Sequence, residues 1–137
     1  MFSKFKNHIS ENSWVQYLLV FVFGLAVYTV SCAPSILWQD SGAFIYRVMH
    51  YDFVGQLGLA LSHPFYILVS IPFKFLPFGE VAGRINFVSS FFGALTVANV
   101  FILGKRLKAG NWPALTGSLS LLFSWTFWFH SAVAEVY

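Results

Sequence analysis

Residues 14–33 read WVQYLLVFVFGLAVYTVSCA, and no charged residue occurs from Asn12 through Gln39. About 20 apolar residues are what an α-helix needs to cross the hydrocarbon core of a bilayer. Pro34 follows directly, and proline does not continue a helix. The sequence therefore predicts a first transmembrane helix over about 14–33.

The composition of the whole chain also indicates a membrane protein. Of its 137 residues, 58% are hydrophobic and 9% are charged, against roughly 25% charged in soluble domains. Such a chain cannot cover itself with polar side chains, so lipid must contact much of its surface. The basic residues form no patch suited to a nucleic-acid groove, so we expect no nucleic-acid partner.

Cys32 is the only cysteine, which excludes an internal disulfide and most thiolate metal sites. Because Ser31-Cys32 follows an apolar run, lipoprotein processing is an alternative to a transmembrane helix. The run is long for a signal sequence, so an uncleaved helix with a packed thiol is favoured.

Two later segments are further candidate spans. Residues 85–104 carry no charge and lie between Arg84 and the basic cluster KRLK at 105–108. The sequence GNWP at 110–113 predicts a tight turn, with a tryptophan suited to the membrane interface. A third span is then expected over about 112–130.

The connecting loop, about 34–84, predicts two helices that lie in the interface. Over 40–54, apolar residues recur at helical spacing and charged residues interrupt them. The second helix is expected over about 64–78; residues 65–78 contain two prolines and would reach about 21 Å, short of a core of about 30 Å. Extending this segment back to 56 would allow it to cross, but would place His63-Pro64 in mid-membrane.

The positions of the basic residues favour the arrangement in which the 64–78 segment does not cross the membrane, because cytoplasmic ends of spans collect Lys and Arg. With three spans, Lys4, Lys6 and the cluster at 105–108 share the cytoplasmic side. The sequence thus predicts an all-α integral membrane protein, multi-pass, with three transmembrane helices, two interfacial helices and a cytoplasmic N-terminus. The groups expected on the outer face are Asp40, His63, Arg84 and Glu135.

Four short motifs occur along this loop and beyond it: WQDSG at 38–42, SHP at 62–64, GRIN at 83–86 running into FGAL at 92–95, and AEVY at 134–137. In this order they resemble the N-terminal part of the GT-C-type integral membrane glycosyltransferases. Within that family, they are most similar to the branch that contains the transmembrane protein O-mannosyltransferase of animals and its bacterial relatives.

The resemblance implies transfer of a sugar from a polyprenyl-phosphate donor to a hydroxyl of a protein or glycan acceptor. The reaction is expected on the outer face of a bacterial inner membrane or an ER-type membrane. Asp40 is the expected general base. The resemblance also gives His63, Arg84 and Glu135 as expected substrate-binding residues. Arg47 and Lys74 are expected to join them on chemical grounds, as cations that stabilise charge on the leaving phosphate.

The chain departs from this family in one respect that bears on cofactors. Ala43 stands where relatives carry a second acid, and hard cations prefer several oxygen ligands. We therefore expect no cofactor, and a divalent metal at Asp40 is disfavoured. Members of the family have many more spans, so we expect a fragment or a truncated gene product that is inactive alone.

Two other classes remain as alternatives. A non-catalytic small membrane subunit fits the length of the chain. A transporter fragment would call for broken helices and ionisable groups at mid-depth, whereas the acids here stand at the ends of the predicted spans.

Overall fold

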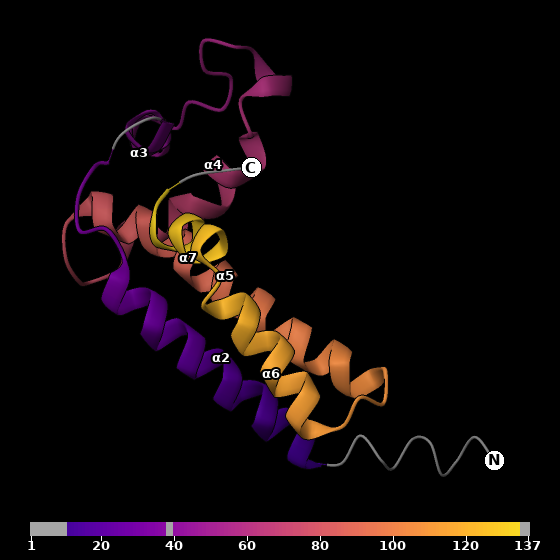
Figure 1. Cartoon of the computed structure of the whole chain (residues 1–137). Helices are drawn as coiled ribbons and strands as arrows, with labels where there is room; N and C mark the ends of the chain where they lie inside the picture. The colour runs from indigo at the N-terminus through magenta and orange to yellow at the C-terminus, as the bar shows by residue number, and fades with distance from the viewer. Residues whose placement is uncertain (1–10, 38–39, 135–137) are drawn as a thin grey trace.

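The computed structural model describes residues 11–37 and 40–134, which are helical and contain no strand within those ranges. Six α-helices and two 3₁₀ helices follow in order (Figure 1). They are α2 (Glu11–Ser31), α3 (Asp40–His50), η1 (Leu59–Leu61), α4 (Pro64–Ser70), η2 (Ile71–Phe75), α5 (Val81–Arg106), α6 (Asn111–Leu122) and α7 (Trp125–Ala132).

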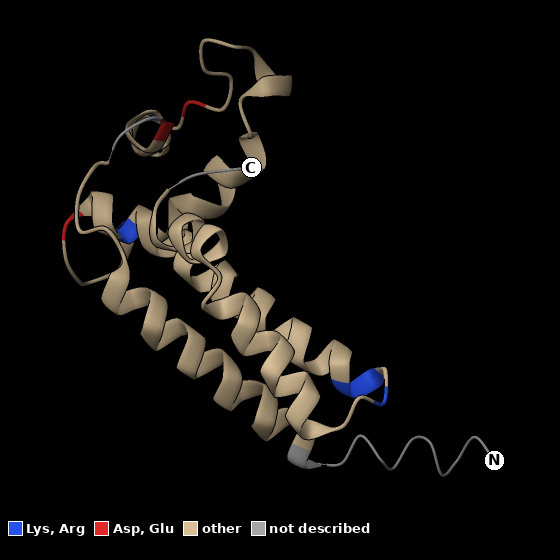
Figure 2. Ribbon diagram, in the orientation of Figure 1, with Lys and Arg blue, Asp and Glu red and all other residues tan. Residues whose placement is uncertain are grey.

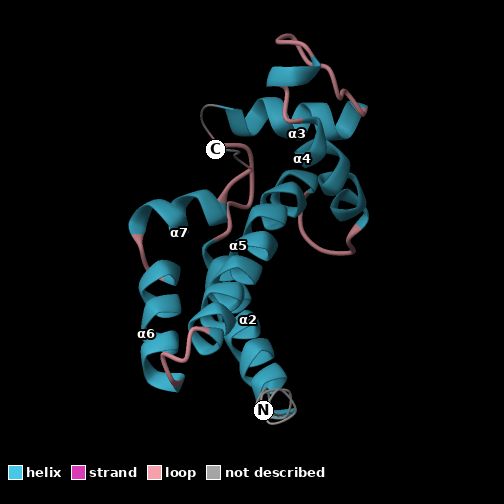
Figure 3. Cartoon of the chain, turned by 90° about the vertical axis from the view of Figure 1, so that its right-hand side faces the viewer, coloured by secondary structure: helices cyan, strands magenta, loops and turns pink. Residues whose placement is uncertain are grey.

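The two long helices, α2 and α5, pack antiparallel and form the frame of the molecule (Figures 1 and 3). Near one end, the Tyr17 hydroxyl donates to Asn99 Oδ1 at 3.2 Å. Further along, a Cβ added to Gly24 would lie 3.6 Å from the Cβ of Ala94. Small residues at this contact let the helix backbones approach closely, as is usual for helices in membranes.

Both helices of this frame are long and apolar enough to cross a membrane, over Ser13–Ser31 and Val81–Arg106. They match the first two spans predicted from the sequence, and they fit a membrane protein. The second helix is longer than its uncharged stretch, because it begins at Val81 and takes Arg84 into its first turn.

The predicted third span, 112–130, is not one helix. Helix α6 ends at Leu122, α7 begins at Trp125, and Ser124 between them has an extended backbone. Figure 3 shows α7 turned sharply across the end of α6. The Tyr28 hydroxyl donates to the carbonyl of Leu122 at 3.1 Å, so a side chain from α2 satisfies a group at the break. At 1.5 Å per residue, neither piece reaches the roughly 30 Å of a bilayer core.

Both segments predicted as interfacial helices are helical, but the helices are shorter than expected. Helix α3 ends at His50, and Tyr51 after it has a positive φ of 56°. The second is α4, of seven residues, followed by the five residues of η2. Together these would reach only about 20 Å, well short of a bilayer core of about 30 Å.

A small apolar cluster joins this loop region to the frame. Phe44, Ile45 and Val48 of α3 pack with Ile67 of α4, Ile85 of α5 and Ala134. The cluster holds α3 and α4 at one end of the α2–α5 pair, which we call the α3 end. Figure 2 shows acidic residues coloured on the ribbon at the α3 end, and basic residues both near that end and in a cluster at the opposite end, where α5 turns into α6.

Candidate active site

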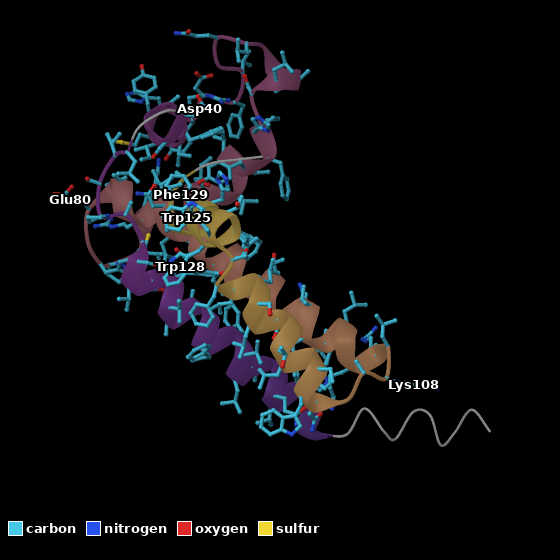
Figure 4. The ribbon with its side chains drawn as sticks, in the orientation of Figure 1. Asp40, Glu80, Lys108, Trp125, Trp128 and Phe129 are labelled. Atoms are coloured by element: carbon cyan, nitrogen blue, oxygen red, sulfur yellow. The ribbon has the colours of Figure 1, made fainter. Side chains whose placement is uncertain are left out.

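Asp40 lies in the first turn of α3, and its side chain is exposed at the α3 end (Figure 4). One side of the helix is buried, through Ser41, Phe44, Ile45 and Val48, and Asp40 lies at the edge of that side in the exposed first turn. This amphipathic arrangement follows from the spacing of the apolar residues. The Asp40 carboxylate is therefore accessible to a molecule that binds at the α3 end.

His63 is close to α3 in space. It precedes α4 as the N-cap residue, in the left-handed backbone conformation with φ 46° and ψ 53°, and it is exposed. Its ring meets the edge of the Phe44 ring, with 6.0 Å between centroids. Phe44 follows Asp40 by one helical turn, so the structure brings these two predicted site residues to the same end of α3.

Arg84 is engaged with the backbone of the loop that precedes α5. Its Nε donates to the carbonyls of Phe78 and Gly79, and its terminal nitrogens donate to Gly79 at 2.7 Å and to Lys74 at 2.9 Å. The guanidinium therefore closes the turn between η2 and α5.

Arg47 serves the loop after α3 in a similar way. It donates to the carbonyls of Asp52 and Phe53, and its Nε lies 4.0 Å from the Asp52 carboxylate. Asp52 in turn accepts hydrogen bonds from the backbone nitrogens of Val54 and Gly55. The predicted substrate ligand Arg47 is thus part of a turn.

Lys74 is held differently from the two arginines. Its Nζ lies 3.6 Å from the centroid of the Tyr51 ring and 5.1 Å from that of Phe75. These are cation–π contacts, in which the ammonium is attracted by the face of the ring. The last predicted ligand, Glu135, lies outside the described residues, which end at Ala134.

A cavity of about 790 Å³ opens beside His63, between α4, α5 and the α6–α7 break. Its walls are mostly apolar, and aromatic side chains from all three elements contribute, among them Phe65, Phe92 and Phe127. His63 and His130 both line it. A largely apolar pocket with a few polar groups is the usual form of a small-molecule site.

Two hydroxyls in the wall of this cavity, Tyr66 OH and Ser89 Oγ, are buried without a hydrogen-bond partner. Burial raises the pKa of Tyr66 to about 12, while the nearby hydroxyls of Ser89 and Ser70 lower it by less and make no hydrogen bond of good geometry to the phenol. The phenol is therefore protonated at neutral pH. It can donate a hydrogen bond but does not act as a base.

Metal-binding capacity is low in the part of the chain that the structure describes. No group of three or more His, Cys, Asp or Glu side chains lies close enough together there to hold an ion.

Sequence reasoning gave no role to Asn86, which is fully buried in the first turns of α5. It hydrogen-bonds the backbone of residues 33, 35 and 134. The available signal was a lone amide near the start of an apolar run, because a buried amide must find partners. The cavity residues Tyr66, Ser89 and His130 were also missed, since no motif contains them.

The comparison with family models decides which family this is. The model described as the Protein O-mannosyl-transferase TMEM260 N-terminal domain matches residues 40–137, well over half of the chain. The chain belongs to this family. The match begins at Asp40, so the family's N-terminal domain takes in α3 through α7 and the candidate site.

A curated relative supports the same assignment. The Protein O-mannosyl-transferase TMEM260 of Mus musculus is 32% identical over 123 residues, which is 86% of this chain. The chain covers only 16% of the length of that mouse protein. No solved structure gives a significant match. The resemblance noted from the four motifs is confirmed at the level of the family.

Proposed function

We propose that these residues form the N-terminal part of a glycosyltransferase that moves a sugar from a polyprenyl-phosphate donor to a hydroxyl acceptor on a protein or glycan. The observation that carries this proposal is an exposed carboxylate, Asp40, at the first residue of the family match and one helical turn from the His63 contact. An enzyme of this kind needs a base at the surface where lipid and water meet.

In the proposed reaction, the Asp40 carboxylate takes the proton of the acceptor hydroxyl as its oxygen attacks the anomeric carbon. The bond between that carbon and the phosphate oxygen breaks, and the polyprenyl phosphate leaves with the electron pair. His63 orients Asp40 or bonds the phosphate. Glu135, which follows Ala134 in the sequence, is proposed to bind substrate as well.

The three predicted cationic ligands differ in how many of their N–H groups remain available to bind a phosphate. Arg84 and Arg47 use most of their N–H groups on backbone carbonyls. Among the described residues, the ammonium of Lys74 contacts only aromatic faces. We therefore assign Lys74 the direct contact with the leaving phosphate, with Arg84 supporting it through the Lys74 carbonyl and adding positive charge.

The aromatic cavity beside His63 is proposed to receive the first part of the donor's lipid chain. It is apolar on most of its wall and includes His63, whose ring contacts Phe44 of α3. An isoprenoid chain gains free energy by leaving water for such a wall. Tyr66 and Ser89 contribute to the cavity wall, but their hydroxyls are buried and do not face its open space.

For the membrane, we propose a multi-pass arrangement with the N-terminus cytoplasmic and the α3 end outside. Helices α2 and α5 cross, and the α6–α7 segment returns toward the α3 end. The basic cluster at 105–108 lies at the end opposite to Asp40, where Lys108 is labelled in Figure 4. The position of this basic cluster agrees with the tendency of basic residues to stay in the cytoplasm.

The proposal is tested by comparing two acids at the α3 end in the full-length gene product. We expect Asp40→Asn to lower sugar transfer from a lipid-linked donor by about 10²- to 10⁴-fold, the usual contribution of a general base. Glu80→Gln is the matched control, since Glu80 is also exposed near this end (Figure 4). Undiminished transfer by Asp40→Asn would remove Asp40 from its proposed role.

One observation favours the transporter alternative, namely the break between α6 and α7. Transport sites use such breaks to expose backbone groups to an ion or substrate. Here the Leu122 carbonyl accepts from Tyr28, and the Ser124 carbonyl accepts from the Trp128 nitrogen. Because these groups have partners within the protein, the enzyme proposal is the better supported.

A further inference from the structure

The side chain of Asn86 joins three segments that are distant in sequence. Its Nδ2 donates to the carbonyls of Ala33 at 2.8 Å and Ser35 at 3.0 Å, and its Oδ1 accepts from the Ala134 nitrogen at 2.9 Å. The side chain is fully buried. Both N–H groups of the amide, and its oxygen, therefore form hydrogen bonds to other segments of the chain.

Each of these contacts lies next to a proposed catalytic or binding group. The segment 33–35 leads into α3, and Ile36 packs on Gly42, where an added Cβ would lie 3.2 Å from the Ile36 side chain. Gly42 follows Asp40 by two residues. On the other side, Ala134 directly precedes Glu135 and packs against Phe44, Ile45 and Val48 of α3.

The surrounding contacts are close enough to pass a shift at Asn86 on to both segments. The Ala33 nitrogen donates to the Ala132 carbonyl at 2.9 Å. Gly83, one turn before Asn86, lets the chain approach so closely that an added Cβ would lie 3.0 Å from the Pro34 carbonyl oxygen. One turn after Asn86, Ser90 Oγ donates to the Ser131 carbonyl at 2.8 Å.

We propose that Asn86 is a positioning residue, which sets the place of the Asp40-bearing helix α3 and of the segment before Glu135 relative to the α2–α5 frame. It touches no reacting atom. Its importance for the reaction rests on the proposed function, because only then are Asp40 and Glu135 parts of one site. Its effect on the position of α3 is independent of any activity.

The position of α3 is measured first, in the 137-residue chain reconstituted in lipid nanodiscs with Cys32→Ser. Pairs of spin labels at exposed positions, 15 with 43 and 15 with 129, report the distances from α2 to α3 and from α2 to α7. Asn86→Ala removes all three hydrogen bonds, so both distance distributions should shift and broaden. Asn86→Asp keeps the oxygen that accepts from the Ala134 nitrogen, but it places a second oxygen against the carbonyls of Ala33 and Ser35. Because those carbonyls belong to the segment that leads into α3, the distance distribution for labels 15 and 43 should broaden more than that for labels 15 and 129.

Asn99→Ala is the matched control, because Asn99 is on the same helix and bonds only the exposed Tyr17 hydroxyl among the described residues. It should leave both distributions as in the parent. If Asn86→Ala is too poorly folded to measure, Asn86→Asp alone decides. A distribution for 15 with 43 that is unchanged in a folded Asn86 variant would overturn the proposal.

The link to the reaction is measured in the full-length gene product. Asn86→Asp should lower kcat by about 10²-fold, the size of effect that a misplacement of about 1 Å produces, with the KM for the lipid-linked donor little changed. A loss confined to KM would contradict a positioning role. If Asp40→Asn retains activity while the α3 distances respond to Asn86, the proposed function fails and the positioning role stands.

Discussion

At the scale of single residues, the polar side chains of the loop region mostly serve its own backbone. Arg84, Arg47 and Asp52 each hydrogen-bond backbone groups within about ten residues of themselves. A backbone group near lipid loses its hydrogen bonds to water, and these side-chain hydrogen bonds replace them. The sequence places these groups on the loop but does not reveal whether a guanidinium faces a substrate or its own chain. Asp40 and Lys74 differ from them, because in the described residues neither side chain bonds a backbone group.

Arg84 gives a prediction at this scale. Replacing it by Met removes four donor contacts to carbonyls, and we expect the free energy of unfolding to fall by about 1 to 2 kcal/mol, a value kept low because the guanidinium is partly exposed. Arg84→Lys should recover only a small part, since a single ammonium does not match the fork of donors. The measurement is thermal unfolding in detergent. The exposed Arg106→Met serves as control, and equal stability of the Arg84 and Arg106 variants would contradict the structural role.

At the scale of elements, the break between α6 and α7 decides where the cavity lies. Helix α7 rests on α5 at Gly93, where an added Cβ would lie 2.8 Å from the Ser131 Cβ. The same helix sends Trp128 Nε1 to the Ser31 hydroxyl at 2.8 Å. Helix α7 is therefore held by both frame helices, and the pocket forms in the angle that it makes with α6.

Glycine substitutions test this packing. Gly93→Ala should lower the free energy of unfolding by about 1 to 3 kcal/mol, because the new methyl group forces α7 away from α5. It should also reduce binding of an environment-sensitive lipid probe in the adjacent cavity. Gly117→Ala is the control, since it lies in α6 with open space around the added Cβ. If both alanine variants unfold at the same temperature, the close α5–α7 contact is absent in the membrane.

At the scale of the whole molecule, charge and length together separate the two ends. The exposed acids Asp40 and Glu80 lie at the α3 end, and the basic cluster at 105–108 lies at the other (Figures 2 and 4). Helices α2 and α5 connect these two ends, and each is long and apolar enough to cross a membrane. This arrangement is what the proposed topology needs, with the site on one side of the membrane and the basic turn on the other.

Cysteine accessibility in intact cells tests the topology, in a Cys32→Ser background. Cysteines at 43 and 60, both exposed positions at the α3 end, should react with a membrane-impermeant maleimide added outside. A cysteine at 109, beside the basic cluster, should react only after the membrane is permeabilised. Labelling at 109 from outside would reverse or invalidate the proposed arrangement of spans.

The sequence by itself determined that the chain is helical, suited to lipid, and a member of the O-mannosyl-transferase family named above. Runs of uncharged residues are local patterns, and their length compared with a bilayer needs no tertiary information. The same applies to the short segment at 64–75, whose prolines limit its length. The two long helices were therefore predictable, within a few residues at their ends.

Only the tertiary structure decided the break after Leu122 and the roles of Asn86, Arg84 and the cavity hydroxyls. These depend on partners far along the chain, such as Tyr28 for Leu122, and Ala33 for Asn86. A polar group within apolar surroundings must find a hydrogen-bond partner. Its sequence position shows that need, but only the folded chain shows which backbone group meets it.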